Sequence, residues 1–211
     1  MPTPLSFYTA NTPNGHKVGI YLHEAALPHR QVTLDLGRGD QRRPDYLAIN
    51  PNGKIPAIVD HDQGVTLFES GAILSYLSAR HGHLHPPTAA GQWQVQQWLH
   101  FQIGGIGPML GQLWWFLHAS DGANREAIER YTREALRLCG VVERRLQHSA
   151  YLALDHYSIA DIAAFPWLRT HAELQLDLSP YPRLQRWLDQ IESRPAVQRA
   201  LAASRPASAE A

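Results

Sequence analysis

NPNGKIPAIVDHDQGVTLFESGAILSYL, residues 50–77, is the stretch that decides the fold of the first part of the chain. Residues 57–59 and 65–68 are apolar or β-branched and flank a turn signal at 61–64, which predicts a β-hairpin. Ile73, Tyr76 and Leu77 then recur at helical spacing. The stretch therefore predicts two antiparallel strands followed by an amphipathic helix that ends near residue 82.

The residues before this stretch predict a βαβ arrangement. Residues 5–8 form a short apolar run, residues 15–26 have helical periodicity, and residues 32–36 alternate between apolar and polar. Residues 44–49 are long enough for one or two helical turns. We therefore predict a small α/β domain over residues 1–82.

The residues after this stretch predict only helices. The segment 83–91, HLHPPTAAG, contains two prolines and predicts a linker. Helical patterns follow at 92–118, 128–146, 159–175 and 182–192, and Gly104, Gly105, Gly107 and Pro108 should kink or loosen the first of them. We predict an all-helical domain over residues 92–201 and a frayed tail at 202–211.

The composition excludes several classes of protein. The chain has 211 residues, and 19 Lys and Arg residues balance 19 Asp and Glu residues. A neutral chain has no basic surface for nucleic acid or anionic membranes, and it is compatible with a homo-oligomer. We find no apolar run long enough to span a membrane and no secretory signal at the start. Cys139 is the only cysteine, which fits a reducing cytoplasm.

Ile55-Pro56 is a candidate cis peptide bond at the start of a strand. Proline has no N–H and cannot continue a central ladder, whereas Ile55 keeps its own N–H and C=O. If these groups face a cleft, the backbone of a ligand can pair with them as an added strand. The alternative is a proline that only initiates the strand.

Glu69-Ser70 precedes a predicted helix, and Ser70 is a favourable N-cap residue. Helix N-termini attract carboxylates, and Glu69 could accept hydrogen bonds from an ammonium group. The pair would suit an α-amino-acid zwitterion. The alternative is an ordinary cap beside a solvated acid.

Thr12, Pro13 and Asn14 lie between the first strand and the first helix, where Asn14 is a natural N-cap. A free thiol has a pKa near 8.5, and helix N–H groups with a Thr hydroxyl or Asn amide would favour its anion. The alternative is a turn and cap without chemistry.

Ser158-Ile159-Ala160-Asp161 has the spacing of a capping box before an apolar run. Reciprocal hydrogen bonds between Ser158 and Asp161 would account for both residues. A structural role is therefore preferred over catalysis by Asp161.

The order of these motifs resembles the glutathione transferase superfamily over nearly the whole chain. Six segments look like the bacterial nu-class enzymes, which are similar in turn to the fungal prion-forming nitrogen regulator: TPNGHK at 12–17, residues 36–60, LFESGAILSYL at 67–77, GGIGPMLGQ at 104–112, IERY at 128–131 and YSIADIA at 157–163. The resemblance implies a thioredoxin-like N-terminal domain, a helical C-terminal domain, and a homodimer.

The resemblance also implies roles for individual residues. Thr12 and Asn14 would face the sulfur of glutathione, and Tyr8 is the alternative thiol activator. The remaining glutathione-binding residues would be Gln41, Lys54, Ile55, Pro56, Glu69, Ser70 and, across a dimer interface, Arg130.

The implied activity is disulfide reduction by the thiolate of bound glutathione, the co-substrate, without a protein cysteine. Cys139 has no CxxC partner and is expected to be a packed core residue. Conjugation or peroxidase activity on a hydrophobic electrophile is the first alternative, and a non-catalytic glutathione-binding regulator is the second.

Aromatic residues and histidines are candidates for a second-substrate pocket and for a metal site. Trp114, Trp115 and Met109 would line a second-substrate pocket, unless the aromatic run packs between helices. Trp93, Trp98 and Trp187 are expected in the core. Residues 81–85 contain three alternating histidines, but no Cys or acidic partner lies near them, so we expect no metal.

Overall fold

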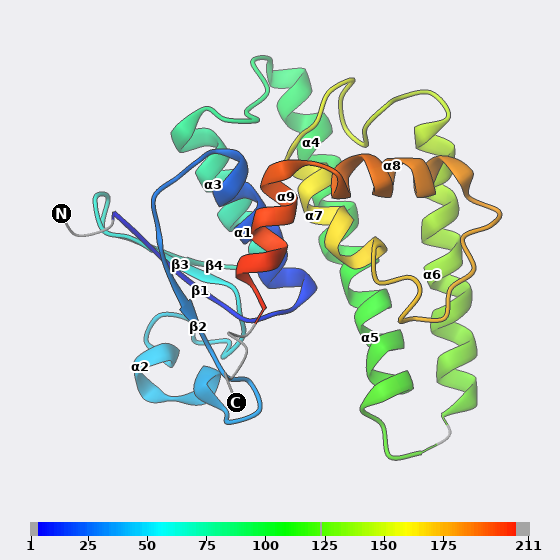
Figure 1. Ribbon diagram of the computed structural model, residues 1–211, viewed down its shortest axis with the longest axis horizontal. Helices are drawn as coiled ribbons and strands as arrows, with labels where there is room; N and C mark the ends of the chain where they lie inside the picture. Colours follow the sequence, from blue (N-terminus) through cyan, green and yellow to red (C-terminus); the bar gives the residue numbers. More distant parts are fainter. Residues whose placement is uncertain (1–3, 123, 206–211) are drawn as a thin grey trace. The chain divides into compact units, whose positions relative to one another are not determined.

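The computed structural model describes residues 4–122 and 124–205 and divides into two compact units (Figure 1). One unit is Met1–His83 together with Ser193–Ala211, and the other is Leu84–Glu192. Expectations for residues 1–3 and 206–211, including the start of the chain and most of the tail, lie outside the described residues. Within the described part of the chain, no helix is long and apolar enough to cross a membrane.

The first unit has the predicted thioredoxin-like order of elements. Its strands form one sheet in the order β2-β1-β3-β4, in which only β1 and β2 are parallel. Helices α1 and α3 pack side by side, and α2 lies apart from them (Figure 1). The elements are β1 (Leu5–Thr9), α1 (Pro13–Glu24), β2 (Arg30–Thr33), η1 (Asp40–Arg42), α2 (Pro44–Leu47), β3 (Ala57–Asp60), β4 (Val65–Phe68) and α3 (Ser70–His81).

The core of this unit follows the apolar periodicity of the sequence. Phe7 and Ile58 are register partners in β1 and β3, and both are buried. The helices cover the sheet with the apolar faces expected from their spacing, which are buried at Val18, Tyr21, Leu22, Ile73, Leu74 and Leu77.

Helix α9 (Pro195–Ala203) packs on α1 and belongs to this first unit. The predicted helical domain ran to residue 201, so the units differ from the prediction at this end. Arg194, just before α9, donates to both carboxylate oxygens of Glu24 at 2.6 and 3.0 Å. This ion pair joins the start of α9 to the end of α1.

The second unit contains only helices within its described residues, as predicted. The glycine-rich interruption is a π-helical turn, η2 (Gln102–Ile106), between α4 (Ala89–Phe101) and α5 (Gly107–His118). Helices α5 and α6 run side by side in Figure 1. The remaining helices are α6 (Arg125–Leu146), α7 (Ile159–Leu168) and α8 (Pro182–Glu192).

Two boundaries in this unit were wrong. The predicted linker at 83–91 ends in helix, because the Thr88 hydroxyl accepts a hydrogen bond from Gly91 N at 3.1 Å and starts α4. The helix predicted at 159–175 ends at Leu168, two residues after Pro166, and turns follow.

Candidate functional site

Strand register brings three loops of the first unit to one end of the sheet. Ala57, the first residue of β3, lies opposite Tyr8 near the end of β1 and opposite Phe68 at the end of β4. The segment after β1, the segment before β3 and the segment after β4 therefore leave the sheet together. These are the segments that carry Thr12, Ile55-Pro56 and Glu69-Ser70.

Thr12 is the N-cap of α1, and the prediction of Asn14 as the cap was wrong. The Thr12 hydroxyl accepts from Gly15 N at 3.3 Å, and Pro13 occupies the first helical position. Asn14 lies half-buried in the first turn. A hydroxyl that accepts one hydrogen bond still carries a hydrogen of its own to donate, so Thr12 can cap the helix and hold an anion.

Gly15 explains how closely α1 follows β1. A Cβ atom at this position would lie 2.4 Å from the Ala10 carbonyl oxygen and 2.4 Å from Thr9 Oγ1. Only glycine permits that approach, which sets the position of Thr12. Gly15 stands in the turn cluster of the sequence, but its contact with Ala10 is not visible there.

The Ile55-Pro56 peptide bond is cis, which confirms the prediction. The Lys54 carbonyl before it accepts from Tyr46 Oη at 2.6 Å and from Asn50 Nδ2 at 2.5 Å. Among residues 4–122 and 124–205, neither the N–H nor the C=O of Ile55 has a hydrogen-bond partner. The backbone of Ile55 thus lies outside the β3 ladder and can pair with an extended ligand.

Gln41 lies in η1 with its backbone carbonyl facing Gly53, and Lys54 follows Gly53 in the chain. A Cβ atom on Gly53 would lie 3.2 Å from the Gln41 carbonyl oxygen. The Gln41 amide donates to Leu36 O at 3.4 Å, and Lys54 is exposed. The structure therefore brings the backbone of Gln41 next to the residue that precedes Lys54.

Glu69 rather than Ser70 is the N-cap of α3, so the predicted cap was wrong by one residue. Glu69 has φ 70° and ψ 113° and makes no side-chain cap hydrogen bond. A non-glycine residue at positive φ is strained, and such residues gather at functional sites. This backbone leaves the Glu69 carboxylate exposed and places Ser70 in the first helical turn, where it is buried.

Lys17 is a further residue of the site that the sequence did not reveal. Its side chain comes from α1, is 2% exposed, and donates to Ser70 Oγ at 3.3 Å. Burial lowers the pKa of the Lys17 ammonium from 10.5 to about 7, against the opposing effect of the Glu69 carboxylate. A lysine in the apolar stripe of an amphipathic helix is the signal that could have identified it.

Tyr8 lies beside this end of the sheet. Its ring packs against that of Tyr46 with centroids 5.8 Å apart, and Tyr46 in turn holds the Lys54 carbonyl. These contacts give Tyr8 a packing role.

Cys139 belongs to the core of the helical unit. It is 1% exposed, and burial raises the pKa of its thiol to about 12. A buried thiol with such a pKa is not a nucleophile at neutral pH. Within the described residues, no group of three or more His, Cys, Asp and Glu side chains could hold a metal ion.

The aromatic run of α5 lies on the surface of its own unit. Trp114 is 39% exposed and Trp115 is 47% exposed, so the alternative in which the run packs between helices was wrong for them. Met109 is half-buried on the same helix. Trp93, expected in the core, is 74% exposed, whereas Trp187 is buried.

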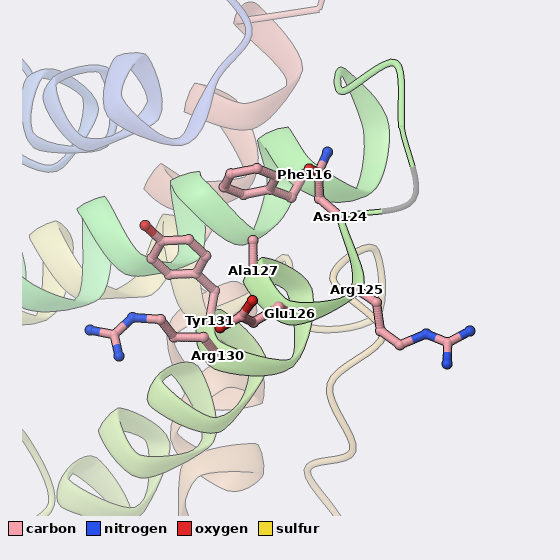
Figure 2. A pocket seen from close by; sticks show the side chains of 7 residues that line it. All are labelled: Phe116, Asn124, Arg125, Glu126, Ala127, Arg130 and Tyr131. Atoms are coloured by element: carbon pink, nitrogen blue, oxygen red, sulfur yellow. The ribbon is translucent and has the colours of Figure 1, made fainter.

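Arg130 borders a hollow of about 530 Å³ between α5 and the start of α6. Phe116 and Tyr131 stack beside it with ring centroids 5.7 Å apart. Figure 2 shows the guanidinium groups of Arg125 and Arg130 pointing to opposite sides, away from Phe116. The Arg130 side chain is therefore exposed at the surface of this unit.

The capping box at the start of α7 is confirmed. Asp161 accepts from Ser158 N at 3.0 Å and from Ser158 Oγ at 2.9 Å. Its other oxygen accepts from Leu152 N at 2.9 Å and Trp187 Nε1 at 3.1 Å. The carboxylate therefore fastens a loop, α7 and α8 together.

Comparison with known proteins identifies the chain. The models of the glutathione S-transferase N-terminal and C-terminal domains match residues 12–80 and 107–195. The chain is 46% identical over 202 residues to the disulfide-bond oxidoreductase YfcG of Escherichia coli (strain K12), with 93% of this chain and 94% of YfcG covered. The chain belongs to the glutathione transferase family.

Solved structures of glutathione transferases agree with this assignment. One from Burkholderia graminis, with two glutathione molecules bound per subunit, has a TM-score of 0.93 and 42% identity over 98% of this chain and 90% of its own. One from Pseudomonas putida, with one glutathione disulfide bound per subunit, has a TM-score of 0.89 and 38% identity over 95% and 91%. The predicted family, glutathione transferase fold and enzyme type are thereby confirmed.

Proposed function

We propose that this glutathione transferase is a nu-class, glutathione-dependent disulfide-bond oxidoreductase. The observation that carries the proposal is the strand register, which gathers the α1 N-terminus, the Ile55 backbone and the α3 N-terminus at one end of the sheet. An extended, acidic tripeptide thiol needs three kinds of contact: hydrogen-bond donors for its thiolate, a protein backbone that pairs with its own backbone, and a site that binds its α-amino-acid zwitterion.

Each part of glutathione has a counterpart in this arrangement. The cysteinyl backbone pairs with Ile55 ahead of Pro56, and the γ-glutamyl group lies at Glu69 and Ser70. Lys54 and Gln41, whose backbone carbonyl faces Gly53, line the glycyl end.

The sulfur lies at the N-terminus of α1, near Thr12 and Asn14. The Thr12 hydroxyl and the helix terminus lower the pKa of the bound thiol, and a decrease of about two units needs about 2.7 kcal/mol. One charge-assisted hydrogen bond together with a helix terminus can supply this free energy.

The reaction is two thiol–disulfide exchanges. The glutathione thiolate attacks one sulfur of the substrate disulfide, forms a mixed disulfide with it, and releases the other sulfur as a thiolate. A second glutathione thiolate then attacks the mixed disulfide, giving glutathione disulfide and the second substrate thiol. The protein itself is not oxidised, which accords with the buried, high-pKa Cys139. The proposal is supported by the similarity to the disulfide-bond oxidoreductase YfcG and by the glutathione and glutathione disulfide bound in the two similar solved structures.

Assembly and location extend the proposal. We propose a cytoplasmic homodimer in which Arg130 reaches the ligand of the partner subunit. The presentation of Arg130 at the surface of its unit supports this role. The absence of nucleic acid, membrane and metal partners stays an expectation.

A specific observation favours a second activity on the same thiolate. Trp114 and Trp115 give α5 an exposed aromatic surface, which would suit a bulky aromatic electrophile. Conjugation or peroxide reduction is therefore the second candidate, with Trp114, Trp115 and Met109 as its substrate contacts. A non-catalytic glutathione-binding protein would show binding without turnover.

Turnover with glutathione and hydroxyethyl disulfide, cumene hydroperoxide or 1-chloro-2,4-dinitrobenzene separates these functions. We expect the disulfide to be the preferred substrate. A Thr12→Ala/Asn14→Ala variant should lose about 10- to 100-fold in rate at pH 7 and recover part of it at pH 9, because the bound thiol then ionises without help.

Thr88→Ala is the matched control, since Thr88 caps α4 with the same kind of hydrogen bond as Thr12. It should keep the activity. Full disulfide reductase activity in the Thr12→Ala/Asn14→Ala variant would contradict the site assignment.

A further inference from the structure

The buried ammonium of Lys17 lies directly behind the first turn of α3. Lys17 Nζ is 3.3 Å from Ser70 Oγ, and the Lys17 side chain reaches this point from α1, the other helix of the site. Burying a lysine is costly because its charge loses hydration, and buried lysines persist where they have a specific task. Here the charge lies under the proposed seat of the γ-glutamyl carboxylate.

We propose that Lys17 is a positioning residue for glutathione: its protonated side chain turns the Ser70 hydroxyl toward the γ-glutamyl carboxylate and couples binding of that carboxylate to uptake of a proton. This inference rests on the proposed function, because it deepens the role of the Glu69-Ser70 contact.

The direction of the Ser70 hydroxyl follows from hydrogen-bond chemistry. A lysine ammonium has only donors, so Ser70 Oγ must accept from Lys17 and direct its own hydrogen elsewhere, toward a ligand oxygen. A neutral lysine amine can accept instead, and the Ser70 hydrogen then turns inward, away from the ligand. The protonation state of Lys17 thus selects between a donor and a non-donor form of Ser70.

The positive charge of protonated Lys17 also favours a bound carboxylate, in addition to its effect on the Ser70 hydroxyl. The N-terminus of α3 carries a partial positive charge, and Lys17 adds a full one beside it when protonated. A carboxylate bound at this terminus stabilises the ammonium and raises its pKa from about 7 in the free protein. Binding therefore takes up a proton at neutral pH, and affinity falls as the pH rises above 7.

The other charged groups on the elements around Lys17 do not account for the expected proton uptake. Glu69 is the charged group that acts on Lys17, and its carboxylate raises the Lys17 pKa against the effect of burial. The other charged and titratable groups on α1, α3 and α9 interact with other residues: His16 with Asn11 and Ser204, Tyr21 with the His83 carbonyl, Glu24 with Arg194, Tyr76 and Arg80 with Asp60, His81 with Arg80, and Arg199 with His23.

Binding of S-methylglutathione, measured by isothermal titration calorimetry from pH 6 to pH 8, tests the coupling, because its sulfur cannot ionise. If binding raises the Lys17 pKa from about 7 to about 8, the Kd at pH 8 should be about fivefold higher than at pH 6. Buffers of different ionisation enthalpy should show uptake of about half a proton at pH 7.5.

Three variants isolate the role of Lys17. Lys17→Met should bind about tenfold more weakly at pH 6 and lose the pH dependence, since it has no charge to gain. Lys17→Arg stays protonated over the whole range, so its affinity should be independent of pH and close to that of the wild type at pH 6. Arg80→Met removes a charge from the other end of α3 and should keep the wild-type pH dependence.

The outcomes separate this inference from the proposed function. A wild-type protein that does not bind S-methylglutathione would overturn both. Tight binding by the wild type without proton uptake, or the same pH dependence in Lys17→Met, would overturn the role of Lys17 alone. The proton uptake of the wild type decides the question even if Lys17→Met does not fold, which circular dichroism would reveal.

Discussion

Replacing Asp161 should lower the free energy of unfolding of the helical unit, because Asp161 has a structural role. Its carboxylate is fully buried and accepts hydrogen bonds from two backbone N–H groups, one hydroxyl and one indole N–H. In Asp161→Ala, three of these donors, Leu152 N, Ser158 N and Trp187 Nε1, lose their acceptor inside the core. The Ser158 hydroxyl can rotate to another partner.

The magnitude follows from two opposing effects. Each buried N–H left without a partner costs about 1–3 kcal/mol, which gives about 3–9 kcal/mol for three. Burial raises the pKa of the Asp161 carboxyl, so removing the charge recovers part of its desolvation cost. We therefore expect Asp161→Ala to lose about 3–5 kcal/mol, a large share of a typical stability of about 5–15 kcal/mol. Asp161→Asn keeps one acceptor oxygen and should lose about 1–3 kcal/mol.

Urea unfolding followed by tryptophan fluorescence and far-UV circular dichroism measures these losses. Asp155→Ala is the control, because that carboxylate is 96% exposed and should not matter for stability. A free energy of unfolding for Asp161→Ala within about 1 kcal/mol of the wild type would refute the role of the hydrogen bonds. So would an Asp161→Asn variant less stable than Asp161→Ala.

Two further perturbations test the core of the helical unit and the packing of α9. Cys139→Ala should keep full glutathione-dependent disulfide reductase activity, because the thiol is buried with a pKa of about 12, and loss of turnover with unchanged folding would show that a protein thiol takes part. Arg194→Met leaves the nearly buried Glu24 without its bidentate partner and should lower the stability of the α1–α9 packing by about 1–3 kcal/mol. Faster amide hydrogen exchange in α9 and at the end of α1 would reveal this loss, and Arg205→Met is the control. Unchanged exchange in Arg194→Met would contradict an anchoring role for Arg194.

The sequence predicts the order of elements in the first unit, and the start of α7 in the second, because each signal is local. The turn at 61–64 specifies the hairpin, Pro56 marks the start of β3, and the spacing from Ser158 to Asp161 specifies a capping box. These patterns involve residues within a few positions of each other, so no tertiary information is needed.

The caps of the site helices were predicted one or two residues away from their true positions for a common reason. N-cap preference selects Asn14 and Ser70, whereas the structure uses Thr12 and Glu69. The close approach of Gly15 to Ala10 fixes where α1 starts, and the positive φ of Glu69 fixes where α3 starts. The local course of the backbone thus overrides the N-cap preference of the side chains.

The contact partners of Lys17 and of α9 could not be predicted, because each partner lies far away in sequence. Periodicity shows that a helix has an apolar face, but it does not show which element covers that face. The contact of α9 with α1 and that of Lys17 with Ser70 exist only once the chain is folded.

The packing of α9 on α1 has a consequence for biosynthesis. The first unit is discontinuous in sequence, because Leu84–Glu192 is inserted between its two parts. About 170–180 residues separate the end of α1 from α9, so at ribosomal rates of about 5–20 residues per second α1 waits roughly 9–36 s for the helix that covers it. The emerging thioredoxin-like segment therefore presents an uncovered helix face throughout synthesis of the helical unit. A truncated protein that ends near residue 83 would keep this helix face exposed, so it should be less soluble than the full chain.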